Sequence, residues 1–113
     1  MMTEWKFPQV CHHRARKQYV CCMCSSLILP GDAYCRVVDI DRGKYVVDKY
    51  CAPCDLALEN YILDNQITED DFLPDASELH SYLSDNLAGK DKIYQDLLSK
   101  CLARLNRKLG WDN

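Results

Sequence analysis

The chain has 113 residues, of which 48% are hydrophobic and 27% charged, and its formal net charge at pH 7 is −3. This length suits one compact domain, and no apolar run approaches the ~18 residues of a membrane-spanning helix, so we expect no membrane contact. Residues 1–8 lack the apolar core of a secretory signal. Eight cysteines in an intracellular chain favour a metal site over disulfides, and the sequence therefore predicts a cytoplasmic protein.

The charges are distributed unevenly. Residues 50–89 contain nine acidic residues and no lysine or arginine, which gives −9. Residues 1–49 carry eight basic and five acidic residues, and residues 90–113 carry six and three, so each segment is +3. A block of one sign attracts basic partners and repels nucleic acid, although ordinary solvation of helix faces explains any single acid equally well.

Residues 1–19 are predicted to form an N-terminal arm. Arg14, Arg16 and Lys17 belong to this arm, and Arg42 and Lys44 belong to a later hairpin. Because basic side chains neutralise phosphates, these five residues are candidate nucleic-acid contacts. The alternative is a solvated strand or turn that leads into the metal site, and we favour it because a short basic run is a weak signal.

Two Cys-x-x-Cys pairs dominate the next segment. Cys21 and Cys24 are separated from Cys51 and Cys54 by 26 residues. Four thiolates can surround one Zn²⁺ tetrahedrally, and a site closed by four cysteines leaves no position for a reacting water. The sequence therefore predicts one structural zinc ion.

The remaining cysteines and histidines leave alternatives open. Cys22 could compete with Cys21 or Cys24 as a ligand, but the Cys-x-x-Cys spacing favours these two outer cysteines. A second zinc site that combines Cys11, His12 or His13, and Cys35 is a further alternative. For Cys35 the more ordinary interpretation is a small buried side chain.

Residues 20–65 are predicted to form a zinc-binding unit. Ala33 to Ile40 and Lys44 to Tyr50 are rich in Val, Ile and Tyr, which predicts two strands, and Gly43 suits the turn of a hairpin. Pro53 fits the first turn of a helix, and Asp55 complements the positive end of its dipole. The expected order is knuckle, hairpin and helix.

This order carries a resemblance to a known family. The matching residues are Cys21-x-x-Cys24, Ile28-x-Pro30-Gly31-Asp32-x-Tyr34 and Tyr50-Cys51-x-x-Cys54. The pattern resembles half of a LIM domain. With His13-Arg14-Ala15-Arg16-Lys17 upstream, it is closer to small zinc-finger proteins of bacteriophages and their bacterial hosts. The resemblance implies an α+β treble-clef zinc finger in the cytoplasm of a bacterial host.

Residues 66–113 are expected to form a small C-terminal helical region packed on the zinc unit. Helices are predicted from about Ala76 to Leu87 and from about Asp91 to Leu109, with Arg104, Arg107 and Lys108 complementing the C-terminal end of the second. An apolar stripe spans an arc of about 140° on the last helix. It consists of Leu97, Leu98, Cys101, Leu102, Leu105 and Leu109. Two helices of the same chain, a second subunit in a homodimer, or a host protein could cover it, and Cys101 and His80 are expected to be structural.

We expect no catalysis, because a closed tetrad has no open position and no other catalytic pattern stands out. The preferred function is a protein-interaction module of a phage or mobile element that modulates a host protein, with a counter-defence inhibitor such as an anti-CRISPR as one version. Its predicted surface is acidic, includes exposed Phe72 and Tyr82, and suits a partner with a basic surface. The acidic residues are Glu69, Asp70, Asp71, Asp75, Glu78 and Asp85. The alternative is nucleic-acid binding through the basic arm and hairpin, where Arg36 and Lys49 add positive charge.

Overall fold

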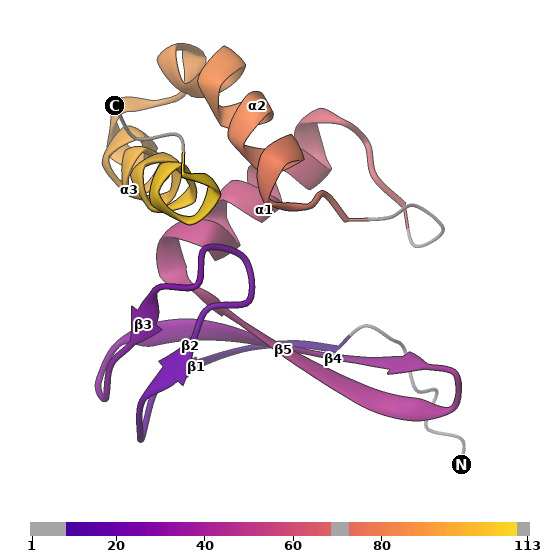
Figure 1. Cartoon of the computed structure of the whole chain (residues 1–113). Coiled ribbons are helices and arrows are strands. Elements are labelled where there is room, and N and C mark those ends of the chain that lie inside the picture. Colours follow the sequence, from indigo (N-terminus) through magenta and orange to yellow (C-terminus); the bar gives the residue numbers. More distant parts are fainter. Residues whose placement is uncertain (1–8, 69–72, 111–113) are drawn as a thin grey trace.

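The computed structural model of the chain describes residues 9–68 and 73–110. These residues form a mixed α and β structure, with antiparallel strands in the N-terminal half and helices in the C-terminal half. Figure 1 shows the helices gathered on one side of the strands, with the β4–β5 hairpin extending away from them. The α+β class predicted from the sequence is confirmed.

The larger sheet has the strand order β1-β4-β5 and is antiparallel throughout. Its strands are β1 (Gln9–Arg14), β4 (Ala33–Asp41) and β5 (Lys44–Cys51). The predicted hairpin is therefore present, and part of the predicted arm adds a third strand to it. At its turn Arg42 and Gly43 have φ values of 53° and 80°. Positive φ at both central residues is the requirement of the type I′ turn that two-residue hairpin loops favour.

A small knuckle lies between β1 and β4. Its strands are β2 (Tyr19–Val20) and β3 (Leu27–Ile28), which pair antiparallel. The turn between them is closed by hydrogen bonds from Ser25 N to Cys21 O and from Cys21 N to Ser26 O, each 2.9 Å. Cys22 N also donates to Lys49 O at 2.8 Å, which fastens the knuckle to β5.

The helices are α1 (Ala52–Asp64), α2 (Ala76–Asn86) and α3 (Lys92–Leu109), with a short 3₁₀ turn η1 (Leu87–Gly89) after α2. Pro53 lies in the first turn of α1, as predicted, because no backbone donor is missed there. A capping box between Asp75 and Glu78 starts α2. Gly110 ends α3 in the left-handed conformation, with φ of 71°. The predicted limits of α2 and α3 agree with these bounds to within one residue.

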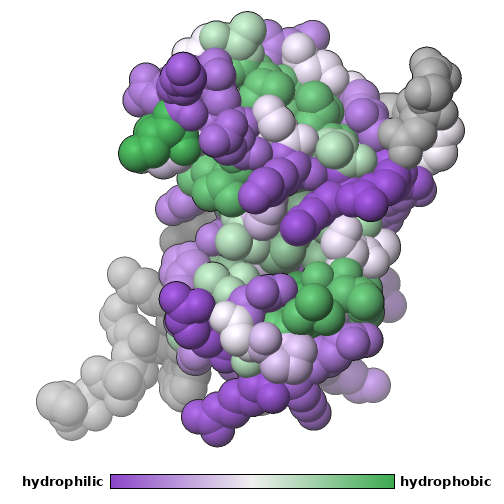
Figure 2. Space-filling view, turned by 90° about the vertical axis from the view of Figure 1, so that its left-hand side faces the viewer, coloured by the Kyte–Doolittle hydropathy of each residue, from purple (hydrophilic) through white to green (hydrophobic). Residues whose placement is uncertain are grey.

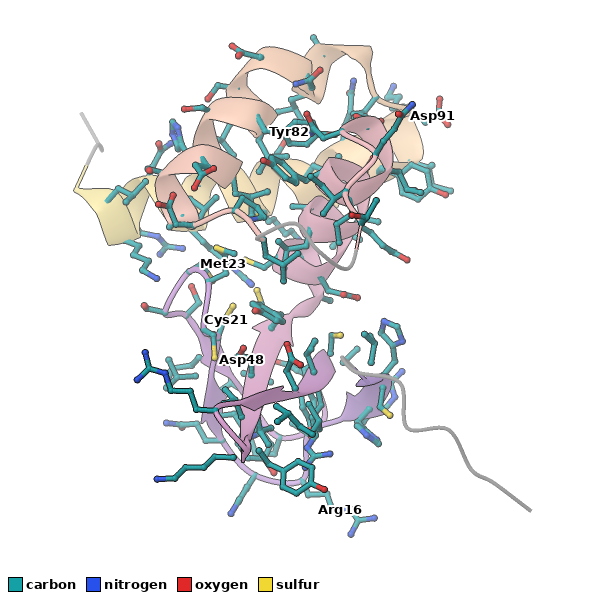
Figure 3. All side chains as sticks on the ribbon, turned by 90° about the vertical axis from the view of Figure 1, so that its right-hand side faces the viewer. Arg16, Cys21, Met23, Asp48, Tyr82 and Asp91 are labelled. Carbon is teal, nitrogen blue, oxygen red and sulfur yellow. The ribbon has the colours of Figure 1, made fainter. Side chains whose placement is uncertain are left out.

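The apolar stripe of α3 is covered by helices of the same chain. Leu98, Cys101 and Leu105 are fully buried where α3 packs against α1 and α2, while Leu97 stays 36% exposed. One continuous core joins these residues to the knuckle and the sheet. Figure 3 shows Cys21 and Met23 at the junction between the strands and the helices. The two layers are therefore packed together at the cysteine pairs.

The surface combines small apolar patches with much hydrophilic area. On the side seen in Figure 2, hydrophobic patches lie on both layers and are separated by hydrophilic side chains. Among the helices within residues 9–68 and 73–110, none combines the length and apolar character needed to cross a membrane.

Candidate metal centre

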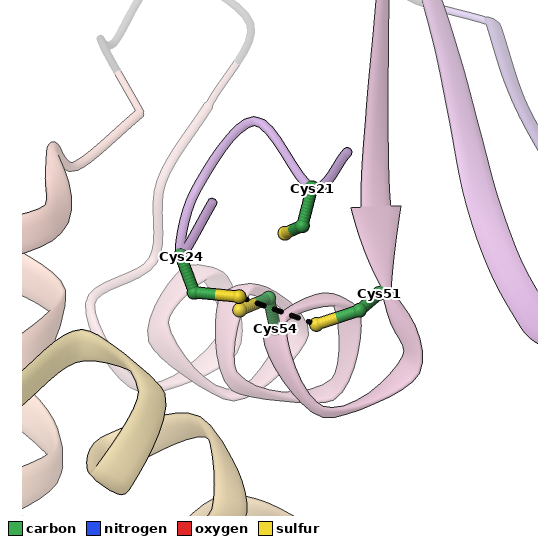
Figure 4. A group of neighbouring side chains, drawn as sticks. All are labelled: Cys21, Cys24, Cys51 and Cys54. Carbon is green, nitrogen blue, oxygen red and sulfur yellow. Dashed lines mark hydrogen bonds between the residues drawn. The ribbon is translucent and has the colours of Figure 1, made fainter. Parts of the chain in front are cut away.

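The four cysteines of the two predicted pairs converge on one point. Cys21 and Cys24 come from the knuckle, Cys51 ends β5, and Cys54 lies in the first turn of α1 (Figure 4). All four are buried, and their sulfur atoms lie within 4.8 Å of one another. The Cys24 and Cys51 sulfurs are 3.7 Å apart. A tetrahedral zinc with Zn–S bonds of about 2.3 Å places its sulfurs roughly 3.8 Å apart, so the cluster has the dimensions to hold one zinc ion.

The cluster needs a cation to carry four thiolates. Hydrogen bonds from the Cys21 thiol, and then from Cys51 and Cys54, hold the pKa of Cys24 far below its usual range. Cys21 and then Cys24 have the opposite effect on Cys51 and raise the pKa of its thiol. One sulfur thus ionises readily and makes ionisation of its neighbour harder. A divalent metal removes this conflict, because it attracts every thiolate at once.

Side chains of α3 lie beside the tetrad and the knuckle. Cys101 Sγ lies 3.5 Å from Cys54 Sγ, within reach of a hydrogen bond to it. Burial of Arg104 disfavours its charge, but a hydrogen bond to Cys51 and the nearby cysteine sulfurs outweigh this and raise the pKa of its guanidinium. Lys108 Nζ donates to Met23 O at 2.6 Å and to Cys22 O at 3.4 Å. Sequence reasoning assigned Arg104 and Lys108 only to the dipole of their own helix, because nothing local shows that this helix end lies over the knuckle.

Cys22 is not part of the tetrad. Its side chain is exposed, and its sulfur accepts a hydrogen bond from Lys49 N at 3.4 Å. Partial burial of the sulfur raises the pKa of this thiol, although the residue as a whole is exposed. The spacing argument that excluded Cys22 is consistent with this position.

A second cluster of possible ligands lies on the sheet face toward α1. The strand register places His12 of β1 opposite Cys35 of β4, and Asp55 of α1 completes a group whose ligand atoms lie within 4.8 Å of one another. His12 Nε2 and Asp55 Oδ2 are 3.0 Å apart. Burial, and then Asp55, raise the pKa of Cys35 to about 12.

This cluster differs from the second site predicted from the sequence. Cys11 pairs with Arg36 on the opposite sheet face and is exposed, so it lies away from Cys35. His13 lies opposite Tyr34 on that same face. Adjacent strand residues point to opposite faces, which is why only one of the three N-terminal candidates can reach Cys35. The third member, Asp55, had been assigned only to the helix dipole.

The predicted acidic surface is described only in part. Glu69, Asp70, Asp71 and Phe72 lie outside the described residues. Glu78 N donates to Asp75 Oδ1 at 2.9 Å, so these two acids have a structural role at the start of α2. Hydrogen bonds from Glu78 N and then from Ser77 lower the pKa of Asp75. Glu78 and Asp85 are exposed and seven residues apart, which places them on one side of α2.

The expectation that Tyr82 is exposed was wrong. Its side chain is 8% exposed, and its ring packs edge-on against Tyr61 of α1, with 5.3 Å between the ring centres. The Tyr82 hydroxyl donates to the Asp64 carboxylate, which also pairs with Lys90. Burial, and then Asp64, raise the pKa of Tyr82. Tyr82 faces α1 because the helix buries the side that carries Leu79 and Leu83. His80, by contrast, is half-buried and bonds to Asn106 of α3, in keeping with the structural role expected for it.

Basic side chains gather on the sheet face opposite α1. A hollow of about 250 Å³ there is lined by His13, Arg14, Arg16, Tyr19, Tyr34 and Arg36. The ring of Tyr19 has Lys49 Nζ at 4.7 Å and Lys17 Nζ at 5.8 Å from its centre. We call Arg16, Lys17, Arg36 and Lys49 the basic face.

The predicted nucleic-acid contacts do not all lie together. Arg14 and Arg16 line the hollow beside Lys17, but Arg42 and Lys44 lie at the turn of the β4–β5 hairpin. Arg14 is opposite the first residue of β4, so that turn is a nine-residue strand away, roughly 30 Å. Arg14 Nη1 also donates to Gly31 O at 3.0 Å, which gives this side chain a structural contact.

Comparison of the chain with known protein families, with curated proteins and with solved structures gave no match.

Proposed function

We propose that the chain is a small, non-enzymatic binding module whose fold is a treble-clef zinc finger extended by two C-terminal helices. One zinc ion in the four-cysteine centre would link the knuckle to the start of α1. Binding of a structural zinc contributes on the order of 10–16 kcal/mol in small zinc-finger peptides, as much as the whole stability of a typical domain. The binding surfaces lie outside the closed tetrad.

The basic face supports nucleic acid as the ligand. Arg16 and Lys17 come from the bend between β1 and β2, Arg36 comes from β4 and Lys49 from β5, and the sheet and the ring of Tyr19 hold these four cations close together. Tyr34 is buried between Tyr19 and His13, so its ring is not available to stack on bases. This arrangement favours contacts with phosphates, which give affinity without sequence preference.

Fluorescence anisotropy with single-stranded and double-stranded oligonucleotides tests this proposal. We expect binding at low salt that weakens as the salt concentration rises. A plot of the logarithm of the association constant against the logarithm of the salt concentration should have a slope of about −0.7 to −0.9 for each neutralised phosphate. The double variant Arg16→Ala/Arg36→Ala should bind at least tenfold more weakly. The matched control is Arg42→Ala/Lys44→Ala, which removes the same charge at the distant hairpin turn. An equal loss of oligonucleotide affinity in both variants, or no binding by the native chain at low salt, would exclude the basic face as a nucleic-acid-binding surface.

The second candidate is a protein partner with a basic surface. Glu78 and Asp85 are exposed on one side of α2, within a forty-residue block that contains no lysine or arginine. The resemblance to phage zinc-finger proteins suggests an accessory protein that modulates a host protein, and a counter-defence inhibitor is one version of this function. The acidic side of α2 would then bind where the partner normally binds nucleic acid.

Affinity capture from nuclease-treated bacterial lysate separates the two candidates. A partner retained after nuclease treatment, and lost from Asp70→Lys/Asp71→Lys/Asp85→Lys, supports the acidic surface. This variant leaves Glu78 in place, because Glu78 caps α2 and its replacement would disturb the helix. If the variant with all three charge reversals still captures the partner, the acidic surface is excluded as the binding site for that partner.

A further inference from the structure

Three side chains from three different elements meet beside α1. His12 comes from β1, Cys35 from β4 and Asp55 from the first turn of α1. The sheet register and the start of α1 fix all three positions, since His12 and Cys35 are opposite each other and Asp55 directly follows Cys54 of the tetrad. A folded four-cysteine centre therefore also holds the third member of this cluster in place.

The three groups are a suitable donor set for zinc. Imidazole nitrogen, thiolate sulfur and carboxylate oxygen are each ordinary zinc ligands, with bonds of about 2.0–2.3 Å, so tetrahedral neighbours lie roughly 3.3–3.8 Å apart. In this cluster all ligand atoms lie within 4.8 Å of one another, and His12 Nε2 and Asp55 Oδ2 are 3.0 Å apart. Small side-chain rotations are enough to bring these atoms around one ion.

The charges of such a site would balance. Two anionic ligands and one neutral imidazole cancel the double charge of Zn²⁺. A neutral complex costs less to place beside apolar side chains than a charged one. The side chain of His12 is 65% exposed and that of Asp55 21% exposed, whereas Cys35 is buried. The metal would therefore enter from the histidine side, and the thiol forms the floor of the site.

The cluster opens into a cavity between α1 and the sheet. This cavity has a volume of about 320 Å³ and a mostly apolar wall. Beside the three candidate ligands, its lining consists of Val10, Val37, Tyr50, Leu58, Glu59 and Ile62. Three protein ligands leave the fourth position of a tetrahedral zinc to water or to an added ligand. The cavity gives that position room.

We propose that His12, Cys35 and Asp55 bind a second zinc ion, with an exchangeable coordination position that faces this cavity. This site is separate from the four-cysteine centre and from the basic face. It would accept a metal-binding group such as a carboxylate, thiol or hydroxamate attached to an apolar chain. On binding, the Cys35 S–H bond breaks, a sulfur–zinc bond forms, and the proton goes to water.

Metal counting on the full-length chain tests the proposal. With excess Zn²⁺, native mass spectrometry should find two zinc ions per native chain and one in His12→Asn. His13→Asn is the matched control, since it removes the neighbouring histidine on the opposite face of β1, and it should keep both ions. Circular dichroism should show the same fold for both variants, because both histidines are exposed. One zinc ion in the native chain, or equal counts in both variants, would overturn the second site.

Cobalt substitution tests the open position. The second equivalent of Co²⁺ should add visible absorption bands, and its sulfur-to-cobalt charge-transfer band should be weaker than that of the first equivalent. Asp55→Asn and His12→Asn should each abolish the bands of the second equivalent. Acetohydroxamate, used as the probe, should change the spectrum of the second equivalent only. A spectrum that acetohydroxamate leaves unchanged would show that the fourth position is closed and would overturn that part of the proposal.

Discussion

Ser25 shows how a single residue limits the stability of the knuckle. It follows the second cysteine of the pair and has φ of 63°, in the left-handed region that favours glycine. An L-residue loses roughly 1–2 kcal/mol in this conformation, while glycine loses about 0.5–1 kcal/mol through its greater freedom in the unfolded chain. The positive φ of Ser25, whose side chain is exposed, therefore lowers the stability of the folded protein.

We predict that Ser25→Gly stabilises the zinc-loaded protein by about 0.5 kcal/mol, the difference between these two effects. Chemical denaturation at fixed zinc concentration measures the change. Ser26→Gly is the control, because Ser26 has no positive φ, so glycine there adds freedom to the unfolded chain, removes the side-chain hydrogen bond to Cys24 and should destabilise the protein. A lower stability in Ser25→Gly would mean that the serine side chain makes a contact worth more than the backbone strain.

At the scale of elements, α3 matters because its last two turns lie over the knuckle. Arg104 and Lys108 are four residues apart, so they lie on one side of the helix and reach the cysteine cluster and the knuckle carbonyls. A zinc ion with four thiolates carries a net charge of −2, and nearby cations stabilise it. The helix thus attaches the C-terminal region to the zinc centre through charge as well as through the buried stripe.

We predict that Arg104→Gln weakens zinc affinity about tenfold, the lower end of the range for groups that surround metal ligands. Lys108→Ala should destabilise the protein by about 1 kcal/mol, because it removes the hydrogen bonds to the carbonyl groups of Met23 and Cys22. Zinc competition with a chromophoric chelator and thermal unfolding measure the two effects. Arg107→Gln is the matched control, since Arg107 has the same charge at the same helix end and is exposed, whereas Arg104 is half-buried. If all three variants behave alike, the charges act on the helix dipole alone.

At the scale of the whole molecule, the parts that were predictable from the sequence are those that local spacing encodes. The two cysteine pairs, the hairpin and the start of α1 each depend on residues close together in the chain, and the structure confirms their arrangement. The capping box of Asp75 and Glu78 is also visible in the sequence as Asp-x-x-Glu before a helix, although the prediction from the sequence places both acids only in an acidic surface. The structural role of these two acids leaves Asp85 as the exposed acid of α2 that bears most directly on a binding surface.

The parts that could not be predicted depend on contacts between distant elements. The pairing of β1 with β4 decides that His12, and not Cys11 or His13, meets Cys35. The direction in which α2 faces α1 decides that Tyr82 is buried. Helical periodicity identifies an apolar face, but it does not tell which neighbour covers it or whether an adjacent aromatic ring is included.

The position of the tetrad at the junction of the layers predicts how the molecule responds to loss of zinc. The tetrad joins the knuckle and β5 to α1, and one apolar core continues from the sheet into the helices (Figures 3 and 4). Cores of chains below ~70–80 residues rarely supply more than ~3–5 kcal/mol, so neither layer alone is large enough to be stable. Without the metal, the ionised thiols also repel one another.

We therefore predict that removal of zinc with a strong chelator unfolds strands and helices together. The near-ultraviolet signal of the tyrosines and the far-ultraviolet signal of the helices should fall at the same chelator concentration. Cys21→Ser should behave like the chelated protein, whereas Cys22→Ser in the same knuckle should keep its zinc and its fold, because the Cys22 sulfur lies outside the tetrad. Because thiols must lose their protons to bind metal, the chelator concentration needed should fall as the pH is lowered. Helices that survive complete removal of zinc would show instead that α1, α2 and α3 form a stable unit without the metal centre.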